Sequence, residues 1–191
     1  MPTDSLISEK DRVRQFWEAE PCGSRYLQKR RAASQEAGEE WNAEDFETHA
    51  RTRYELEPHI PAFANFNSAQ GKKVLEIGVG MGADYLQWLK AGAHATGVDI
   101  SPASIERARK RCGFAGFSGI GLRVADAENL PFPDNSFDVV YSYGAMHHSP
   151  DTARCIQEAR RVLKVGGEAR IMVYHHPSLT GLMLWLRYGV W

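Results

Sequence analysis

From Gly71 onward, short runs of β-branched and other apolar residues alternate with segments of helical periodicity. This alternation predicts strand, helix and strand in turn, an order that requires parallel strands joined by right-handed crossovers. We therefore expect an α/β fold, with a Rossmann-like, doubly wound and mostly parallel sheet that has helices on both faces. The predicted strands are Lys73–Ile77, Ala95–Val98, Ile120–Val124, Phe137–Tyr141 and Ala169–Tyr174. The predicted helices cover about residues 83–91, 102–112 and 152–165.

Cap and turn residues agree with this layout. Ser101 is suited to cap a helix whose first residue is Pro102, where the missing N–H of proline costs no hydrogen bond. Gly166 and Gly167 are expected to end the last helix and to lead into the fifth strand.

Residues 1–70 lack the alternation of strands and are predicted to form a helical cap over the substrate region, while residues 71–191 form the core. One helix is expected over Ser8–Ala19, and a second from Asn42, with Asp45 in its first turn. Aromatic residues in this region can line an apolar ligand pocket or, the favoured interpretation, pack as core. They are Trp17, Tyr26, Trp41, Phe46 and Tyr54.

Composition excludes several classes of protein. The chain has 191 residues, and 23 Lys and Arg against 24 Asp and Glu give a net charge of −1, so neither a nucleic acid nor an anionic membrane is an expected partner. Three widely spaced cysteines favour neither a disulfide framework nor a zinc site. No signal peptide is evident, and the apolar segment Leu179–Trp191 is too short to span a membrane, so a cytoplasmic location is expected.

A glycine-rich turn follows the first predicted strand, in the run Glu76-Ile77-Gly78-Val79-Gly80-Met81-Gly82. Glycines allow a sharp turn and a close ligand approach, and the helix after them offers free N–H groups to an anionic group. The spacing alone is ambiguous, because Gly78, Gly80 and Ala83 also satisfy the dinucleotide-binding pattern. A tight turn that binds nothing is the other alternative.

Carboxylates close the next two strands. Asp99 can accept both hydroxyls of a ribose that lies across the strand ends, and Asp126 can meet the exocyclic amine of an adenine. A helix cap and a surface turn are the respective structural alternatives. Since parallel strands end at one edge of a sheet, these residues and the glycine turn are expected at the edge where open α/β sheets bind ligands.

Four segments, in this order, resemble the motifs of class I S-adenosylmethionine-dependent methyltransferases, specifically the methyltransferase type 11-like domain. They are VLEIGVGMGAD, GVDIS, ADAENLPFPDNSFDVVYSYGAMHHSPD and RVLKVGGEARIMVYHH, and the resemblance covers about residues 70–176. An acidic residue two positions before the first glycine, here Glu76, is typical of that family and not of dinucleotide dehydrogenases.

The resemblance implies S-adenosyl-L-methionine as cofactor. Glu76 would lie near its amino group, Asp99 would hold the ribose, and Ser142 and Tyr143 would lie beside the methionyl end. The full set of cofactor contacts that the resemblance implies is Glu76, Gly78, Gly80, Gly82, Asp99, Ile100, Asp126, Ala127, Ser142 and Tyr143.

Two adjacent histidines, His147 and His148, follow the fourth predicted strand. A histidine with an ordinary pKa can take a proton from an acceptor at neutral pH, so both are candidate catalytic bases. The alternative is a turn with one packed and one solvated imidazole. Nothing in the spacing of this pair or of His175 and His176 supports a metal site.

The predicted function is methyl transfer from S-adenosylmethionine to a small-molecule acceptor by direct in-line displacement. One alternative is an NAD(P)-dependent oxidoreductase. Another is a non-catalytic, cofactor-binding partner subunit.

The C-terminal part departs from the family, whose sheet usually has seven strands. After the fifth predicted strand only the apolar segment Leu179–Tyr188 follows, so the sixth and seventh strands are expected to be missing and the chain to be truncated. The fifth strand would then be an exposed edge. That edge, or the C-terminal helix, is the expected contact of a homo-oligomer.

Overall fold

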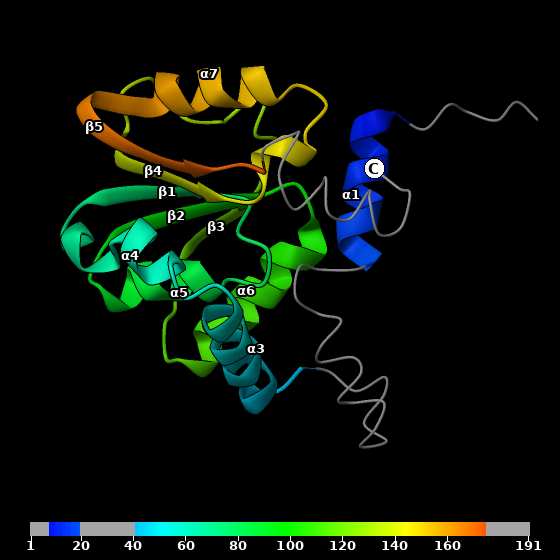
Figure 1. Cartoon of the computed structure of the whole chain (residues 1–191), viewed down its shortest axis with the longest axis vertical. Helices are drawn as coiled ribbons and strands as arrows, with labels where there is room; N and C mark the ends of the chain where they lie inside the picture. Colours follow the sequence, from blue (N-terminus) through cyan, green and yellow to red (C-terminus); the bar gives the residue numbers. More distant parts are fainter. Residues whose placement is uncertain (1–7, 20–40, 175–191) are drawn as a thin grey trace, which may run out of the picture.

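A five-stranded sheet in the order β3-β2-β1-β4-β5 forms the centre of the computed structural model, which describes residues 8–19 and 41–174 (Figure 1). Neighbouring strands are parallel throughout. The chain starts in the middle of the sheet and winds to each edge in turn, which confirms the predicted doubly wound α/β fold. The strands are β1 (Lys73–Ile77), β2 (His94–Asp99), β3 (Gly121–Val124), β4 (Phe137–Tyr143) and β5 (Leu163–Met172).

Helices flank both faces of this sheet (Figure 1). The face toward α7 has a core of Leu75, Ile77 and Val140 packed against Cys155 and Ala159 of that helix. On the other face, Val74 and Val139 pack with Trp88 of α5, among others. The helices are α1 (Glu9–Ala19), α3 (Ala43–Leu56), α4 (Ile60–Ala64), α5 (Ala83–Lys90), α6 (Pro102–Phe114) and α7 (Thr152–Val162), with 3-10 turns η1 (Phe66–Ala69) and η2 (Met146–His148).

The predicted caps are confirmed. The Asn42 side chain accepts the Asp45 N–H at 3.0 Å, and the Asp45 carboxylate accepts the Asn42 N–H at 3.1 Å, which forms a capping box at the start of α3. Ser101 Oγ accepts the Ser104 N–H at 3.1 Å and caps α6 before Pro102.

The junction between the last helix and the last strand is a correction to the predicted boundaries. Helix α7 ends at Val162 rather than near residue 165, and β5 already begins at Leu163, paired with Phe137. The next pair is Glu168 with Val139, so residues 164–167 bulge opposite Asp138. Gly166 has a φ of +77° in this bulge, so the glycines belong to an irregular strand and not to a helix end.

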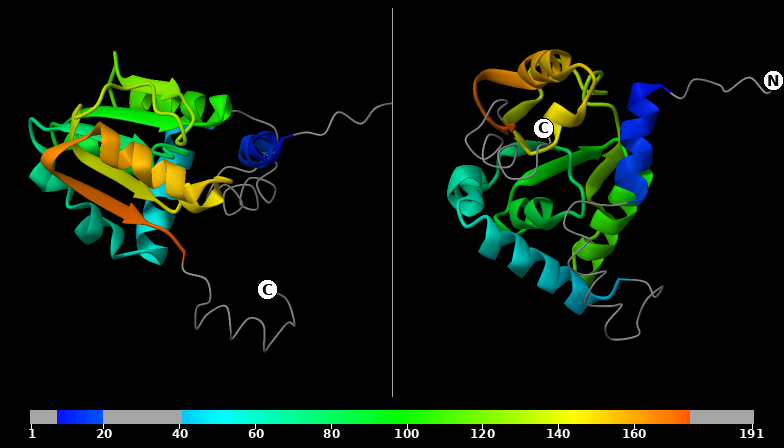
Figure 2. Two further views of the ribbon diagram at one scale, coloured as in Figure 1. Left: turned by 90° about the horizontal axis from the view of Figure 1, so that it is seen from above. Right: turned by 45° about the vertical axis from the view of Figure 1, so that its right-hand side comes forward.

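The carboxyl ends of the strands point toward α1, which lies beyond that edge of the sheet and contacts α6 (Figure 2). Helix α3 packs against α5 and α6. The segments for which we predicted a C-terminal helix and a second histidine pair lie outside the described residues. Within the described ranges, no helix has the length and apolar character needed to cross a membrane.

Candidate active site

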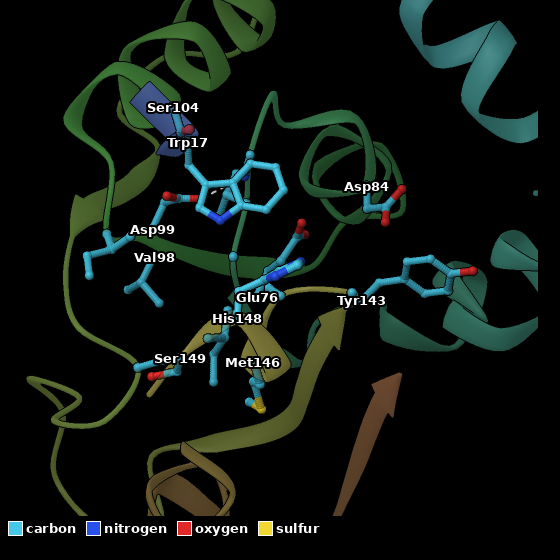
Figure 3. Close-up of a pocket in the computed structure, with 18 of the residues that line it drawn as sticks. Trp17, Glu76, Asp84, Val98, Asp99, Ser104, Tyr143, Met146, His148 and Ser149 are labelled. Carbon is cyan, nitrogen blue, oxygen red and sulfur yellow. Dashed lines mark hydrogen bonds between the residues drawn. The ribbon is translucent and has the colours of Figure 1, made fainter. Parts of the chain in front are cut away.

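A cavity of about 400 Å³ opens at the carboxyl ends of the strands. The glycine turn after β1, the ends of β2 and β4 and the loop after β3 form its floor, and side chains of α1 and α3 complete it. In Figure 3, Trp17 and Asp99 lie on one side, Asp84 and Tyr143 on the other, and Glu76 between them. The cavity therefore brings together residues from both the N-terminal helices and the sheet.

The glycine turn needs glycine for two separate reasons. Gly78 and Gly80 have φ values of +81° and +53°, in the left-handed region that other residues rarely adopt. A Cβ on Gly78 would lie 2.2 Å from Cβ of Ala145, whereas a Cβ on Gly80 would meet nothing within 4 Å. Gly82 does not line the cavity; its backbone packs against Ala108, where a Cβ would lie 2.8 Å from that of Ala108.

We expect Gly78→Ala to destabilise the protein more than Gly80→Ala. Both replacements incur left-handed strain of about 1–2 kcal/mol, but only the first also forces apart a packed contact, at roughly 1–3 kcal/mol more. Urea unfolding of the two variants measures the difference directly. Equal unfolding midpoints would show that the close approach to Ala145 does not matter.

Asp99, at the end of β2, is hydrogen-bonded to the glycine turn. Its Oδ2 accepts the Gly80 N–H at 2.8 Å and its Oδ1 accepts the Ser101 N–H at 2.9 Å. Burial raises the pKa of Asp99, and these N–H donors oppose that rise. Each carboxylate oxygen keeps a lone pair for a further donor, so Asp99 can still receive a hydroxyl from the cavity.

Glu76, the penultimate residue of β1 and two positions before Gly78, is 3% exposed. Its Oε2 is buried and has no hydrogen-bond partner in the described part of the chain. Burial, and then the negative charge of Asp84, hold the pKa of Glu76 well above its usual range. An unpartnered buried acceptor in a cavity wall fits a cationic or N–H donor from a ligand.

Asp84, in the first turn of α5, is equally buried but fully paired. Arg53 of α3 donates to both of its oxygens, from Nε at 3.1 Å and from Nη2 at 2.7 Å. Tyr54 and Tyr141 donate their hydroxyls to it at 3.0 and 2.8 Å. These bonds attach α3 to α5 and to the sheet, and Asp84, their common acceptor, was not among the predicted site residues. The feature of the sequence that could have indicated Asp84 is its position as an acidic residue in the first helical turn, directly after the glycines.

Asp126 and Ala127, in the loop after β3, both line the cavity, as does Ile100. Lys10 of α1 donates to Asp126 at 2.6 Å and to Glu128 at 2.5 Å, and these bonds raise the pKa of Lys10 to about 12. No sequence pattern indicated this contact, because the partners lie more than a hundred positions apart.

The two predicted residues at the end of β4 have different surroundings. Tyr143 lines the cavity, and its hydroxyl lies 3.0 Å from Glu57 Oε1 and 2.6 Å from His59 Nε2. Ser142 is fully buried, donates its hydroxyl to the carbonyl of Ile77 at 2.9 Å and does not line the cavity. This hydrogen bond links β4 to β1.

The adjacent histidines of η2 also have different surroundings. His148 lines the cavity, and its ring lies 4.9 Å from that of Trp17, edge to face. His147 does not line it; its ring packs against Tyr174 at 4.8 Å, and both of its nitrogens are buried without a partner among the described residues. Partial desolvation lowers the pKa of both histidines, which favours their neutral forms.

Metal chemistry has no evident centre in this part of the molecule. Over the described ranges, no three His, Cys, Asp or Glu side chains gather as a ligand set. Cys112 and Cys155 are buried free thiols.

Comparisons with known proteins identify the family to which this chain is similar. Residues 75–171, just over half of the chain, match the family described as "Methyltransferase domain". The chain is 36% identical to the demethylmenaquinone methyltransferase of Tropheryma whipplei, over 56% of this chain and 44% of that one. It is 39% identical to the 27-O-demethylrifamycin SV methyltransferase of Amycolatopsis mediterranei, over 51% of this chain and 36% of that one.

The matched region thus spans less than half the length of these two relatives. Among solved structures, a protein of Pyrococcus horikoshii aligns with a TM-score of 0.53 and 32% identity, over 62% of this chain and 55% of that one. The family match supports the methyltransferase prediction over the dinucleotide-binding alternative. The chain belongs to the methyltransferase domain family, and its motifs are those of the class I, S-adenosylmethionine-dependent members.

Proposed function

We propose that this chain transfers a methyl group from S-adenosylmethionine to a small-molecule acceptor. The observation that carries the proposal is Glu76, a buried carboxylate with an unpartnered oxygen at the head of a glycine turn. It shares one cavity with Asp99 and Asp126. The three carboxylates match the amino group, the ribose hydroxyls and the adenine amine of one ligand.

The cofactor would lie along the strand ends in that order. Glu76 would bind its amino group, and the Gly78–Gly80 backbone would pass beneath its methionyl part. Asp99 would bind the ribose, and Ile100 and Ala127 would contact the adenine. Gly82 and Ser142 would support the site through their packing, without touching the ligand.

The cofactor supplies a methyl group on a positively charged sulfur, which leaves as a neutral thioether. The protein then has to align the acceptor atom with the methyl carbon, and such positioning can provide much of the rate acceleration. His148 is the better placed of the two predicted bases, because it lines the cavity and His147 does not.

Two lines of support favour a small-molecule acceptor. The two relatives described above are named for small molecules, demethylmenaquinone and 27-O-demethylrifamycin SV. Apolar and aromatic side chains such as Val13, Trp17 and Met146 contribute much of the cavity wall.

The N-terminal helices contribute Lys10, Trp17, His49 and Arg53 to the cavity, which supports residues 1–70 as the substrate region. The cytoplasmic location and the self-association stay predictions.

Isothermal calorimetry with S-adenosylmethionine, S-adenosylhomocysteine and NADH tests the cofactor. We expect both sulfur ligands to bind and NADH not to bind. Binding of NADH alone would overturn the proposal. Transfer of a labelled methyl group to hydroxylated aromatic acceptors then separates an enzyme from a module that binds the cofactor without catalysis.

Asp99→Ala is expected to weaken S-adenosylhomocysteine binding by about 10- to 100-fold. Loss of hydrogen bonds to a charged acceptor costs about 1.5–3 kcal/mol. Asp99→Asn, which keeps one acceptor oxygen for the turn, should bind with intermediate affinity, and Glu106→Gln, on the exposed face of α6, should bind as the wild type does. An unchanged affinity of the alanine variant in calorimetry would show that Asp99 does not bind the ribose.

A further inference from the structure

Five carboxylates line the cavity: Glu57, Glu76, Asp84, Asp99 and Asp126. All except Glu57 have a role in the account given so far. Asp84 and Asp126 accept from cationic side chains, and Asp99 accepts two backbone N–H groups. Glu76 is assigned to the cofactor amino group. Glu57 is therefore the carboxylate whose place in the cavity the proposed function leaves unexplained.

Glu57 lies where α3 ends, with its backbone N–H bonded to the carbonyl of Arg53. Within the described part of the chain, its Oε2 has a single long contact, 3.4 Å from Nη1 of Arg53. Its side chain is 30% exposed. One oxygen of Glu57 thus has room for a proton from a bound molecule.

The other oxygen of Glu57 is held in a fixed chain of hydrogen bonds. Oε1 lies 3.0 Å from the hydroxyl of Tyr143, which lies 2.6 Å from Nε2 of His59. A phenol has one proton to donate. If that proton goes to the carboxylate, the imidazole must carry its proton on Nε2 and donate to the phenol oxygen.

Tyr143 itself is unsuited to accept the proton. Burial and the adjacent Glu57 carboxylate raise the pKa of Tyr143 well above its usual range, so the phenol stays protonated. The guanidinium of Arg53 lies over the Tyr143 ring, 5.2 Å from its centre, and helps to hold the ring in place. Tyr143 and His59 are thus positioning residues for the Glu57 carboxylate.

We propose that Glu57 is the proton acceptor of the methyl transfer and that the site takes an aromatic hydroxyl as its acceptor group. This inference rests on the proposed function. In the step, the hydroxyl oxygen forms a bond to the methyl carbon, the sulfur keeps the electron pair of the broken bond, and the hydroxyl proton passes to Glu57.

The choice of an aromatic hydroxyl follows from the walls of this part of the cavity. Tyr143 and Tyr174 line it, and Phe63 packs behind Tyr143 with ring centres 5.9 Å apart. Aromatic faces select a flat ring, and the Glu57 carboxylate, which is bonded to Tyr143, selects a hydrogen-bond donor on the edge of that ring.

The test compares two acceptors that differ in acidity. 1-Naphthol is protonated at mildly alkaline pH and needs a base, whereas 4-nitro-1-naphthol is already ionised there. Glu57→Gln should lower kcat for 1-naphthol by at least about 100-fold but leave the nitro acceptor within about threefold of the wild type. Tyr143→Phe should show a smaller loss, about tenfold, with the same selectivity for the protonated acceptor.

Glu55→Gln is the matched control, since Glu55 is exposed on the same helix, and it should methylate both acceptors at the wild-type rate. Equal loss for both acceptors, or no loss for either, would overturn the proposal. So would a selective loss in His148→Gln instead. A wild-type protein that binds S-adenosylhomocysteine but methylates neither naphthol would refute the acceptor class, whereas failure to bind that ligand would refute the proposed function itself.

Discussion

Glu76→Gln is expected to stabilise the free protein and to weaken cofactor binding severely. The wild-type carboxylate is buried, lacks a partner for Oε2 in the described structure and is repelled by Asp84 and Asp99. A neutral amide of the same shape removes the cost of a buried, incompletely paired charge, about 1–3 kcal/mol, or roughly 2–4 °C in Tm for each kcal/mol.

The pH dependence has a definite sign. Because the pKa of Glu76 is raised in the folded state, the folded protein holds this proton at pH values where the unfolded chain has released it. The wild type therefore loses stability as pH rises above the ordinary glutamate pKa, and the advantage of the variant grows over that range. Thermal unfolding at several pH values measures it, and a variant that is less stable than the wild type at every pH would contradict the prediction.

Although Glu76→Gln should be more stable than the wild type, it should bind S-adenosylhomocysteine more weakly. Without the carboxylate, the ammonium group of S-adenosylhomocysteine loses a buried charge partner, which typically costs about 2–5 kcal/mol, or at least 30-fold in affinity. Calorimetry on the same preparations checks this. Wild-type affinity in the variant would remove Glu76 from the proposed site.

Asp84→Ala is expected to destabilise the protein, in contrast to Glu76→Gln. Asp84 is as buried as Glu76, but it accepts four hydrogen bonds, two of them from Arg53. Its removal leaves a guanidinium that is 18% exposed without this partner, together with the hydroxyls of Tyr54 and Tyr141. Breaking such a buried pair costs about 3–5 kcal/mol, a large part of the 5–15 kcal/mol that stabilises a typical domain.

Chemical denaturation measures this loss, with Tyr54→Phe as the control. That variant removes one of the four bonds and should cost about 1 kcal/mol. An unfolding midpoint for Asp84→Ala equal to that of the control would show that the ion pair contributes little.

The sequence predicted the sheet well, because its strands are short and apolar and its turns are marked by glycine, proline and capping residues. β1 was predicted to the residue, and β2, β3 and β4 to within one or two residues. The error at β5 has a physical origin. Val162 and Leu163 are both apolar and fit a helix as well as a strand, so the periodicity of the sequence could not show that the helix ends between them. The bulge depends on the pairing of Leu163 with Phe137, which is a contact with another strand.

Among the predicted site residues, those at the carboxyl ends of the strands could be placed from the sequence. Glu76, Asp99 and Asp126 lie in one cavity, as their positions after successive strands indicated. Ser142 turned out to face the interior, because alternate residues of a strand point to opposite sides and its hydroxyl found a carbonyl there. The contacts of Lys10 and Glu57 join segments far apart in the chain, so no local pattern could reveal them.

The contact of α1 with the loop after β3 bears on how a ligand enters and leaves. Lys10 and Asp126 are about one-third exposed, so dissolved ions reach this pair and screen it. Glu76, in the middle of the cavity, is shielded from such ions by burial. If the cofactor binds as proposed and passes α1, ionic strength should therefore change its exchange rate much more than the strength with which Glu76 binds its amino group. Different parts of the chain would then set the rate of exchange and the strength of binding.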